Sequence, residues 1–183
     1  MDQDQFWSML ETARQASGGD VQQQAAVLKA QLDRLPQAEV IGFQRILEDL
    51  QAESFSVALW GAAEAIADMV SEDHFFGFRG WLIAQGQATY QAAIANPDSL
   101  ADLPELRVDE EMLPWGEAMW FVASEVHQER TGGWLPPEAC WTTELVGRWW
   151  PYDQHQEQLR RRYPSLRARF RGGTHPEAGG GSA

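Results

Sequence analysis

A chain of 183 residues, 44% hydrophobic and with nine tryptophans, has enough apolar side chains to bury a core without disulfides. The formal net charge of −13 argues against nucleic-acid binding over the whole surface, because acidic surfaces repel phosphate. The lone Cys140 excludes an internal disulfide, and no apolar run reaches the roughly 20 residues that cross a bilayer. Since the opening "MDQDQFW" does not have the basic start of a signal peptide, we expect a cytoplasmic protein without membrane association.

Apolar residues recur every three or four positions in the N-terminal third of the chain, which is the pattern of amphipathic helices. We expect a first helix over residues 3–16 and a second that Asp20 caps and Pro36 closes. A third helix is predicted to run through Val40 and Leu50. These three helices are expected to pack together in antiparallel order.

The segment 53–70 is rich in alanine and other small residues, which let neighbouring helices approach closely. We expect it to form a central helix. Ser71 is a candidate N-cap for the next helix, which should extend to Gly86. Glu72 and Asp73 fall in the first turn of that helix, where its dipole favours negative charge.

The rest of the chain continues the helical pattern with two interruptions. The expected elements are a helix over 87–96, a connector over 97–114, a helix over 116–133, an aromatic loop over 134–153, and final helices over 153–164 and 165–170. Residues 171–183 have the composition of a flexible tail, and "GGGSA" resembles an artificial linker. The fold class is therefore all-α: one compact multi-helix domain over 1–170, with the helices of Trp60 and Trp81 at its centre and an aromatic-rich loop near the C-terminal third.

The stretch "LWGAAEAIADMVSEDHFFGFRGWLIAQGQATYQAAIANPDSL" combines a tryptophan-alanine helix, a turn of serine and two acids, and the closing motif "PDSL". It resembles the core of an uncharacterised bacterial family, domain of unknown function 4240, and the likeness extends over about 4–170. The chain departs from the family pattern at "ADMV" before Ser71 and at Glu72 and Asp73, which replace a double aspartate. The resemblance implies a helical domain without an established activity or cofactor.

Glu72, Asp73, His74 and Arg79 lie within two helical turns of each other. A carboxylate, an imidazole and a guanidinium could together bind an anionic ligand or move a proton. However, Asp73 and Arg79 are six positions apart, which places them about 120° apart around a helix and makes a direct pair poor.

Arg79 stands among large apolar side chains and needs a partner if it is buried, since an unpaired buried charge is costly. The expected partners are Glu64 and Asp68 on the preceding helix. The favoured interpretation is a structural ion pair, and the alternative is that Arg79 lines a ligand site. We expect Arg79→Met to reduce stability more than it reduces any binding.

Other patterns offer weaker candidates for chemistry. Glu125, His127 and Glu129 alternate along a helix, so their side chains point in different directions and cannot hold one metal ion. Ser124 and His127 lack an accompanying nucleophile elbow, and the apolar surroundings of Cys140 make a reactive thiol unfavourable. The sequence thus predicts no catalytic residue, no metal site and no cofactor.

Aromatic side chains are concentrated in the C-terminal half of the sequence. The residues are Trp115, Trp120, Trp134, Trp141, Trp149, Trp150 and Tyr152. Such a group either packs in the core or forms a pocket or a partner surface. Exposed rings would favour a partner surface, because tryptophan and tyrosine dominate binding hot spots. The candidate aromatic contacts for a ligand or partner are Trp81, Trp134, Trp141, Trp149 and Trp150.

The segment from Arg160 to Arg171 carries six of the fourteen basic residues. We expect it to fold back onto the acids of the domain. The alternative is contact with an acidic partner or RNA.

These observations favour a cytoplasmic, non-enzymatic interaction or regulatory module that binds another protein through its aromatic loop and an adjacent acidic face. The alternative is a small-molecule-binding protein or enzyme with its site around Asp73, His74 and Arg79. A deep pocket that reaches those three residues would favour the alternative, and a flat exposed tryptophan patch would favour the first hypothesis.

Overall fold

The computed structural model describes residues 1–67, 70–108, 113–136 and 144–171. These residues form helices and 3-10 turns, with one isolated β-bridge and no strand. The helices are α1 (Gln3–Ala16), α2 (Val21–Leu32), α3 (Gln37–Ser54), α4 (Val57–Ile66), α5 (Glu72–Ala84), α6 (Gln87–Ala95), η1 (Pro97–Asp102), α7 (Ala118–Thr131), η3 (Tyr152–Gln154), α8 (His155–Arg162) and α9 (Pro164–Arg171). The all-α prediction is confirmed.

Side-chain caps fix several helix starts. Asp20 and Ser71 accept hydrogen bonds from the backbone N–H groups three residues later, at 2.8 and 3.2 Å, as the sequence predicts. Ser56 caps α4 in the same way. The prediction of one helix through 53–70 was therefore wrong, because α3 continues to Ser54 and a new helix begins after the Ser56 cap.

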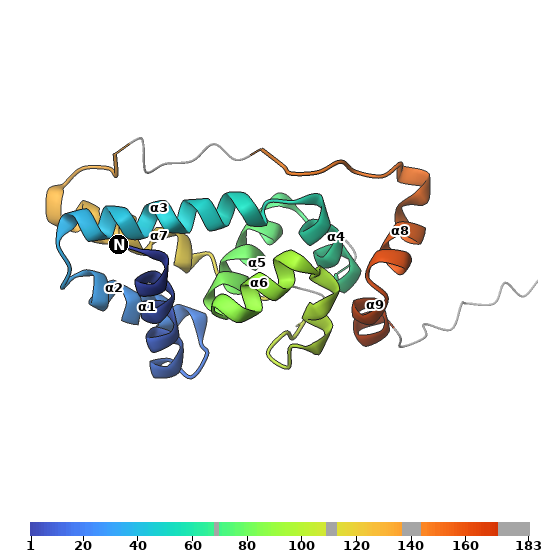
Figure 1. Ribbon diagram of the computed structural model, residues 1–183, viewed down its shortest axis with the longest axis horizontal. Coiled ribbons are helices and arrows are strands. Elements are labelled where there is room, and N and C mark those ends of the chain that lie inside the picture. The colour runs from blue at the N-terminus through green and yellow to red at the C-terminus, as the bar shows by residue number, and fades with distance from the viewer. Residues whose placement is uncertain (68–69, 109–112, 137–143, 172–183) are drawn as a thin grey trace, which may run out of the picture.

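Figure 1 shows an elongated arrangement with α1 and α2 at one end and α8 and α9 at the other, beside α4. The long helix α3 extends between the two ends. The three N-terminal helices do not form a bundle by themselves, since α7 packs against both α2 and α3. The C-terminal half of the chain thus completes the N-terminal part of the core.

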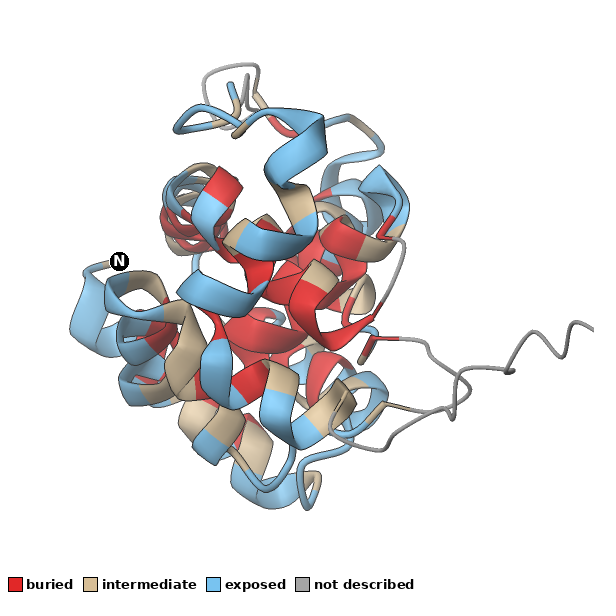
Figure 2. Ribbon diagram, turned by 90° about the vertical axis from the view of Figure 1, so that its right-hand side faces the viewer, coloured by how far each residue is buried: buried red, intermediate tan, exposed pale blue. Residues whose placement is uncertain are grey.

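The core is centred on α4 and α5. In α5 nearly every side chain after the first turn is buried, including Phe75, Phe78, Leu82 and Ile83, which are fully buried. Figure 2 shows buried residues gathered in the middle of the molecule and exposed ones on the surrounding helices. The predicted central position of the Trp60 and Trp81 helices is confirmed.

Gly77 and Gly80 of α5 let the backbone around Gly116 approach this helix closely. The N–H of Gly116 donates to the carbonyl oxygen of Gly77 at 2.9 Å, and the indole of Trp120 donates to Phe76 O at 3.1 Å. A Cβ placed at Gly80 would lie 2.3 Å from the carbonyl oxygen of Gly116. This helix face therefore accepts only glycine without a shift of the neighbouring backbone.

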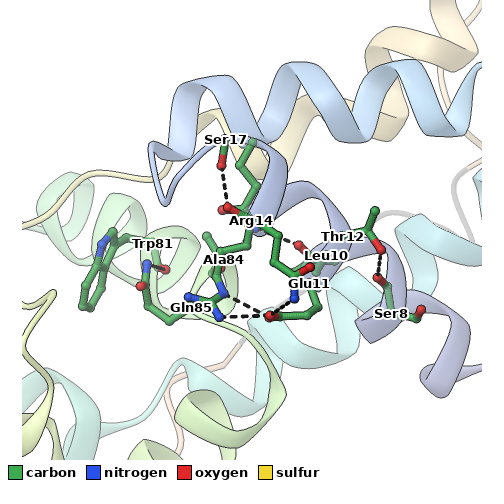
Figure 3. A network of polar contacts seen from close by, with 11 residues as sticks. Ser8, Leu10, Glu11, Thr12, Arg14, Ser17, Trp81, Ala84 and Gln85 are labelled. Carbon is green, nitrogen blue, oxygen red and sulfur yellow. Dashed lines mark hydrogen bonds and ion pairs between the residues drawn. The ribbon is translucent and has the colours of Figure 1, made fainter.

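Buried amide contacts join α1, α2 and α5. The fully buried Gln24 donates to the carbonyl oxygens of Leu10 and Ala84, at 3.2 and 3.1 Å. Figure 3 shows the adjoining polar network on α1, where Arg14 donates twice to Glu11, each time at 3.0 Å. One side chain of α2 thereby fixes the position of two other helices.

The basic C-terminal helices pack back onto the domain. Asp98 accepts the backbone N–H groups of Ser165 and Leu166, at 3.1 and 3.0 Å. Arg169 donates to the carbonyl oxygens of Leu103 and Leu106, each at 2.7 Å. The expected folding back is confirmed, but the contacts of Arg169 are with backbone carbonyls and not with acidic side chains.

Replacement of Gly80 by alanine tests the close approach of Gly116. The added methyl group would meet a backbone oxygen that cannot rotate away, so we expect Gly80→Ala to lower the free energy of unfolding by about 1 to 3 kcal/mol. Gly133→Ala is the matched control, because its nearest contact is an ordinary 3.6 Å to a side chain. Urea unfolding that gives equal midpoints for both variants would contradict the described packing.

Candidate functional site

Arg79 is only 4% exposed and lies inside the core. Its Nη1 donates to the carbonyl oxygen of Gln51 at 2.9 Å. Its guanidinium carbon lies 4.7 Å from the ring centre of Phe55 and 5.1 Å from that of Phe75. Burial lowers the pKa of Arg79 to about 10. A carbonyl dipole and aromatic faces thus stabilise this charge within the core.

The expected ion pair of Arg79 with Glu64 is not formed. Glu64 lies instead beside His155 of α8, while Asp68, the other expected partner, lies outside the described residues. A guanidinium is more weakly hydrated than an ammonium group, which makes aromatic surroundings acceptable to it. Arg79 therefore occupies a core position away from the molecular surface.

The acidic residues before Arg79 do not converge with it. Glu72 and Asp73 are exposed in the first turn of α5. His74 is partly buried, and its ring centre lies 6.3 Å from that of Trp115 in an edge arrangement. The four candidates from the sequence are thus divided between the surface and the core.

The tryptophans of the predicted aromatic loop do not form a single patch. Trp134 is 83% exposed and follows α7, whereas Trp149 and Trp150 pack beside α4 and His155 of α8. The chain that leaves α7 lies at the end of the molecule that α1 and α2 occupy, and α8 lies at the other end (Figure 1). Trp81 is buried in the core, and Trp141 lies outside the described residues.

A pocket of about 930 Å³ opens between α4, the start of α5 and the segment that leads into α8. Its principal lining residues are Glu64, Ser71, His74, Trp149, Trp150 and His155. Of the residues that the sequence analysis selected, it brings together His74, Trp149 and Trp150. Arg79, Asp73 and Trp81 do not line it.

A backbone bridge holds the aromatic wall of the pocket in place. Val57 N–H donates to Val146 O, and Val146 N–H donates to Phe55 O, both at 2.9 Å. Gly61 provides room for the wall on α4, because a Cβ there would lie 2.8 Å from an indole carbon of Trp150. The chain before Trp150 is therefore fixed to the junction of α3 and α4.

Three side chains in contact with one another cross the pocket wall, and two of them share a hydrogen bond. Trp150 Nε1 lies 2.9 Å from His155 Nδ1, and His155 Nε2 lies 3.3 Å from Glu64 Oε2. An indole N–H can only donate, so Nδ1 of His155 must accept and its ring hydrogen must be on Nε2. In this arrangement the Nε2 side of the imidazole is nearest to the carboxyl group.

The carboxyl group of Glu64 is largely buried and has few polar contacts that would offset the loss of its hydration. Its side chain is 17% exposed, and Oε2 accepts no hydrogen bond from the described part of the chain, since the contact with His155 does not have hydrogen-bond geometry. Burial raises the pKa of Glu64 to about 7. Burial thus favours the protonated form of this acid, in a pocket that two indole rings also line.

The alternating residues on α7 make structural contacts. Lys29 Nζ lies 2.6 Å from a carboxylate oxygen of Glu129 and 3.9 Å from one of Glu125, and His127 contacts the amide of Gln37. Within the described ranges, no group of three His, Cys, Asp or Glu side chains is placed to hold a metal ion. The same residues include no helix that is both long and apolar enough to span a membrane.

The fold and the pocket define an all-helical protein with a ligand-sized cavity. The chain belongs to the family described as "Protein of unknown function (DUF4240)", which matches residues 1–129, and the resemblance read from the sequence is confirmed. That match includes Glu64 and His74 but ends before Trp149, Trp150 and His155, and it is shorter than the likeness over 4–170. No curated protein and no solved structure matches the chain.

Glu64, Ser71 and His155 are among the pocket residues that were not selected as site residues from the sequence. Glu64 is an acid among alanines in a helix expected to be central, and that pattern was interpreted only as a possible partner for Arg79. Ser71 was recognised only as a cap. His155 has no local signal, because its role depends on the approach of α8 to α4.

Arg79→Met would remove one of the three hydrogen bonds that the carbonyl oxygen of Gln51 accepts, together with the contacts of the guanidinium with Phe55 and Phe75. We expect this variant to lose about 1 to 3 kcal/mol of stability, because a hydrogen bond from a charged donor and two cation–π contacts are lost. Binding in the pocket should persist, since Arg79 does not line it. Arg160→Met, on the exposed surface of α8, is the control. Equal denaturation midpoints for the two variants would refute a structural role of Arg79.

Glu64→Gln tests the buried carboxyl group. Because its pKa rises from 4.5 to about 7 on folding, the folded state keeps a proton that the unfolded state releases, and stability falls as pH rises through this window. The variant lacks this loss, so its stability relative to the wild type should increase by up to about 3 kcal/mol between pH 5 and pH 8.

Thermal melts across that pH window measure this difference. Glu48, whose pKa burial also raises to about 7, contributes a loss in the same direction to both proteins and cancels in the comparison. The exposed Glu157→Gln is the control. A constant difference between Glu64→Gln and the wild type at every pH would show that the carboxyl group of Glu64 titrates at its ordinary value.

Proposed function

We propose that this protein is a cytoplasmic, non-enzymatic binding module that takes a ligand into the pocket between α4, α5 and α8. The observation that carries the proposal is the pocket itself, whose volume of about 930 Å³ is in the range of small-molecule sites. Its walls combine indole rings with a few polar groups, the composition that ligand pockets usually have.

The proposal joins parts of the two hypotheses drawn from the sequence. Trp149 and Trp150 of the aromatic segment supply the walls, and His74 is the member of the alternative site that lines the pocket. A flat tryptophan patch is less well supported, because Trp134 follows α7 and Trp149 packs against Trp60 of α4. The end of α7 and the α4–α8 region lie at opposite ends of the molecule (Figure 1). The 83% exposure of Trp134 favours a second, separate contact with another protein.

Binding without chemistry is supported by the roles of the polar side chains in the pocket. The Ser71 hydroxyl accepts the N–H of His74 as a helix cap, and His155 accepts the indole N–H of Trp150. A nucleophile needs a base within hydrogen-bond reach, and the Ser71 hydroxyl has no hydrogen bond to an imidazole among the described contacts. These groups stabilise the walls of the pocket.

Gln156→Trp tests the pocket as the binding site. Gln156 is exposed on the rim, so an indole there should obstruct the pocket without disturbing the core. A thermal-shift screen with cationic, anionic, zwitterionic and neutral compounds should find at least one that raises the Tm of the wild type and not that of Gln156→Trp. Mass spectrometry should recover this compound unchanged.

Gln154→Trp is the matched control, because residue 154 is exposed nearby but does not line the pocket. It should keep the wild-type response. The proposal fails if no compound shifts the wild-type Tm, or if the responding compounds act equally on the obstructed variant. Conversion of the bound compound would show an enzyme.

A further inference from the structure

We propose that the pocket binds an organic ammonium group, which pairs with the carboxylate of Glu64 and contacts the indole rings of Trp149 and Trp150. This inference rests on the proposed binding function and specifies the chemical class of its ligand. It depends on three features of the described residues: an uncompensated acid, a neighbouring imidazole whose Nδ1 is occupied by an indole N–H, and two steeply inclined indole rings.

The acid lacks a positive partner inside the pocket. Glu64 Oε2 is shielded from solvent and accepts no hydrogen bond from the described residues. His155 is the basic group nearest to it, at 3.3 Å, but the Trp150 indole occupies its Nδ1. A second proton on His155 would require the hydrogen bond from Trp150 to break. A ligand cation can supply the missing charge without that loss.

The other charged and titratable groups around Glu64 do not replace a ligand cation. Arg162 of α8 lies over the ring of Trp150, 5.2 Å from its centre, and its Nε donates to Gln158. The hydroxyl of Tyr163 donates to a backbone carbonyl of α4 at 2.7 Å. His74 lines the pocket from α5. Among the described contacts, His155 alone comes within ion-pair distance of Glu64.

The indole rings provide suitable walls for a cation. The ring centres of Trp149 and Trp150 are 5.2 Å apart and their planes meet at 76°, so the two rings offer faces in two directions. The face of an indole attracts ammonium groups, and paired aromatic rings are the common recognition device for them. Arg162 already uses the ring of Trp150 in this way.

Ligands of other charge fit the pocket less well. An anion would be repelled by ionised Glu64 and by a protein with a formal net charge of −13. A neutral apolar ligand would displace water and leave the carboxyl group buried without a partner, which is unfavourable. An ammonium ligand removes that penalty, and it favours the ionised form of Glu64 as it binds.

Two pairs of probes of nearly equal shape test the charge requirement. Choline is compared with its neutral isostere 3,3-dimethylbutan-1-ol, and butylammonium is compared with butan-1-ol. The anion 3,3-dimethylbutanoate completes the set. By calorimetric titration, the cation of at least one pair should bind about tenfold or more tightly than its neutral counterpart.

Three variants connect the binding to the proposed contacts. Glu64→Gln should lower the affinity for the cation about tenfold and leave that for the neutral isostere unchanged. Gln156→Trp should abolish binding of both. Glu157→Gln, an exposed acid on α8, should behave as the wild type. In the wild type, the affinity for the cation should rise between about pH 6 and pH 8, because Glu64 ionises over that interval.

A further probe distinguishes the sources of the ammonium group. Nα-acetyl-trimethyllysine amide presents it as a protein side chain would, whereas choline presents it as a free small molecule. Tighter binding of the lysine derivative supports a side-chain ligand, and tighter binding of choline supports a metabolite. Both results agree with the ammonium assignment.

Other outcomes separate the inference from the proposed function. If a neutral or anionic probe binds the wild type as tightly as the cations, and Gln156→Trp still prevents this, the ammonium assignment is wrong and the pocket proposal stands. If no cation binds but the compound screen finds another pocket ligand, the ammonium assignment is also wrong, and the proposal of a binding pocket still stands. If nothing binds in either experiment, both proposals are wrong.

Discussion

The burial of α5 on nearly all its sides determines where the other helices lie. A helix without a solvent-exposed face must be packed against other helices on every side. Here α2, α3, α4, α6 and α7 each pack against α5. Gly77 and Gly80 allow the chain around Gly116 to reach its backbone, while Arg79 occupies the interior with a carbonyl and aromatic rings as its surroundings. The start of this helix, where burial ends, forms one side of the pocket.

Much of the helical fold could be predicted from the sequence because its signals are local. Caps such as Asp20 and Ser71 depend on residues three positions away, and the spacing of apolar side chains reports the period of a helix. The break before α4 was missed because the apolar pattern continues through it, although Ser56 is a good cap. The expected pair of Arg79 with Glu64 was wrong, since the ring of Phe55 can take the place of a carboxylate beside a guanidinium.

The candidate site was predictable only in part, because it is assembled from distant segments. His74, Trp149 and Trp150 were selected for their chemical type, but no sequence pattern places them around one cavity. The contact of Glu64 with His155 depends on how α8 packs on α4, which helical periodicity does not report. Local patterns identify which side chains are able to bind a ligand, whereas the packing of helices decides which of them meet.

The contact between α4 and the end of the chain also affects the order in which the protein can fold. The hydroxyl of Tyr163 bonds to the carbonyl of Ala58, which precedes it by 105 residues, and Trp150 covers Gly61 on the same helix. During synthesis of the chain, this side of α4 stays uncovered until the segment with Trp150 and Tyr163 has been made. Closure of the pocket thus depends on long-range contacts, and the region of the family match is synthesised before the residues that complete the site.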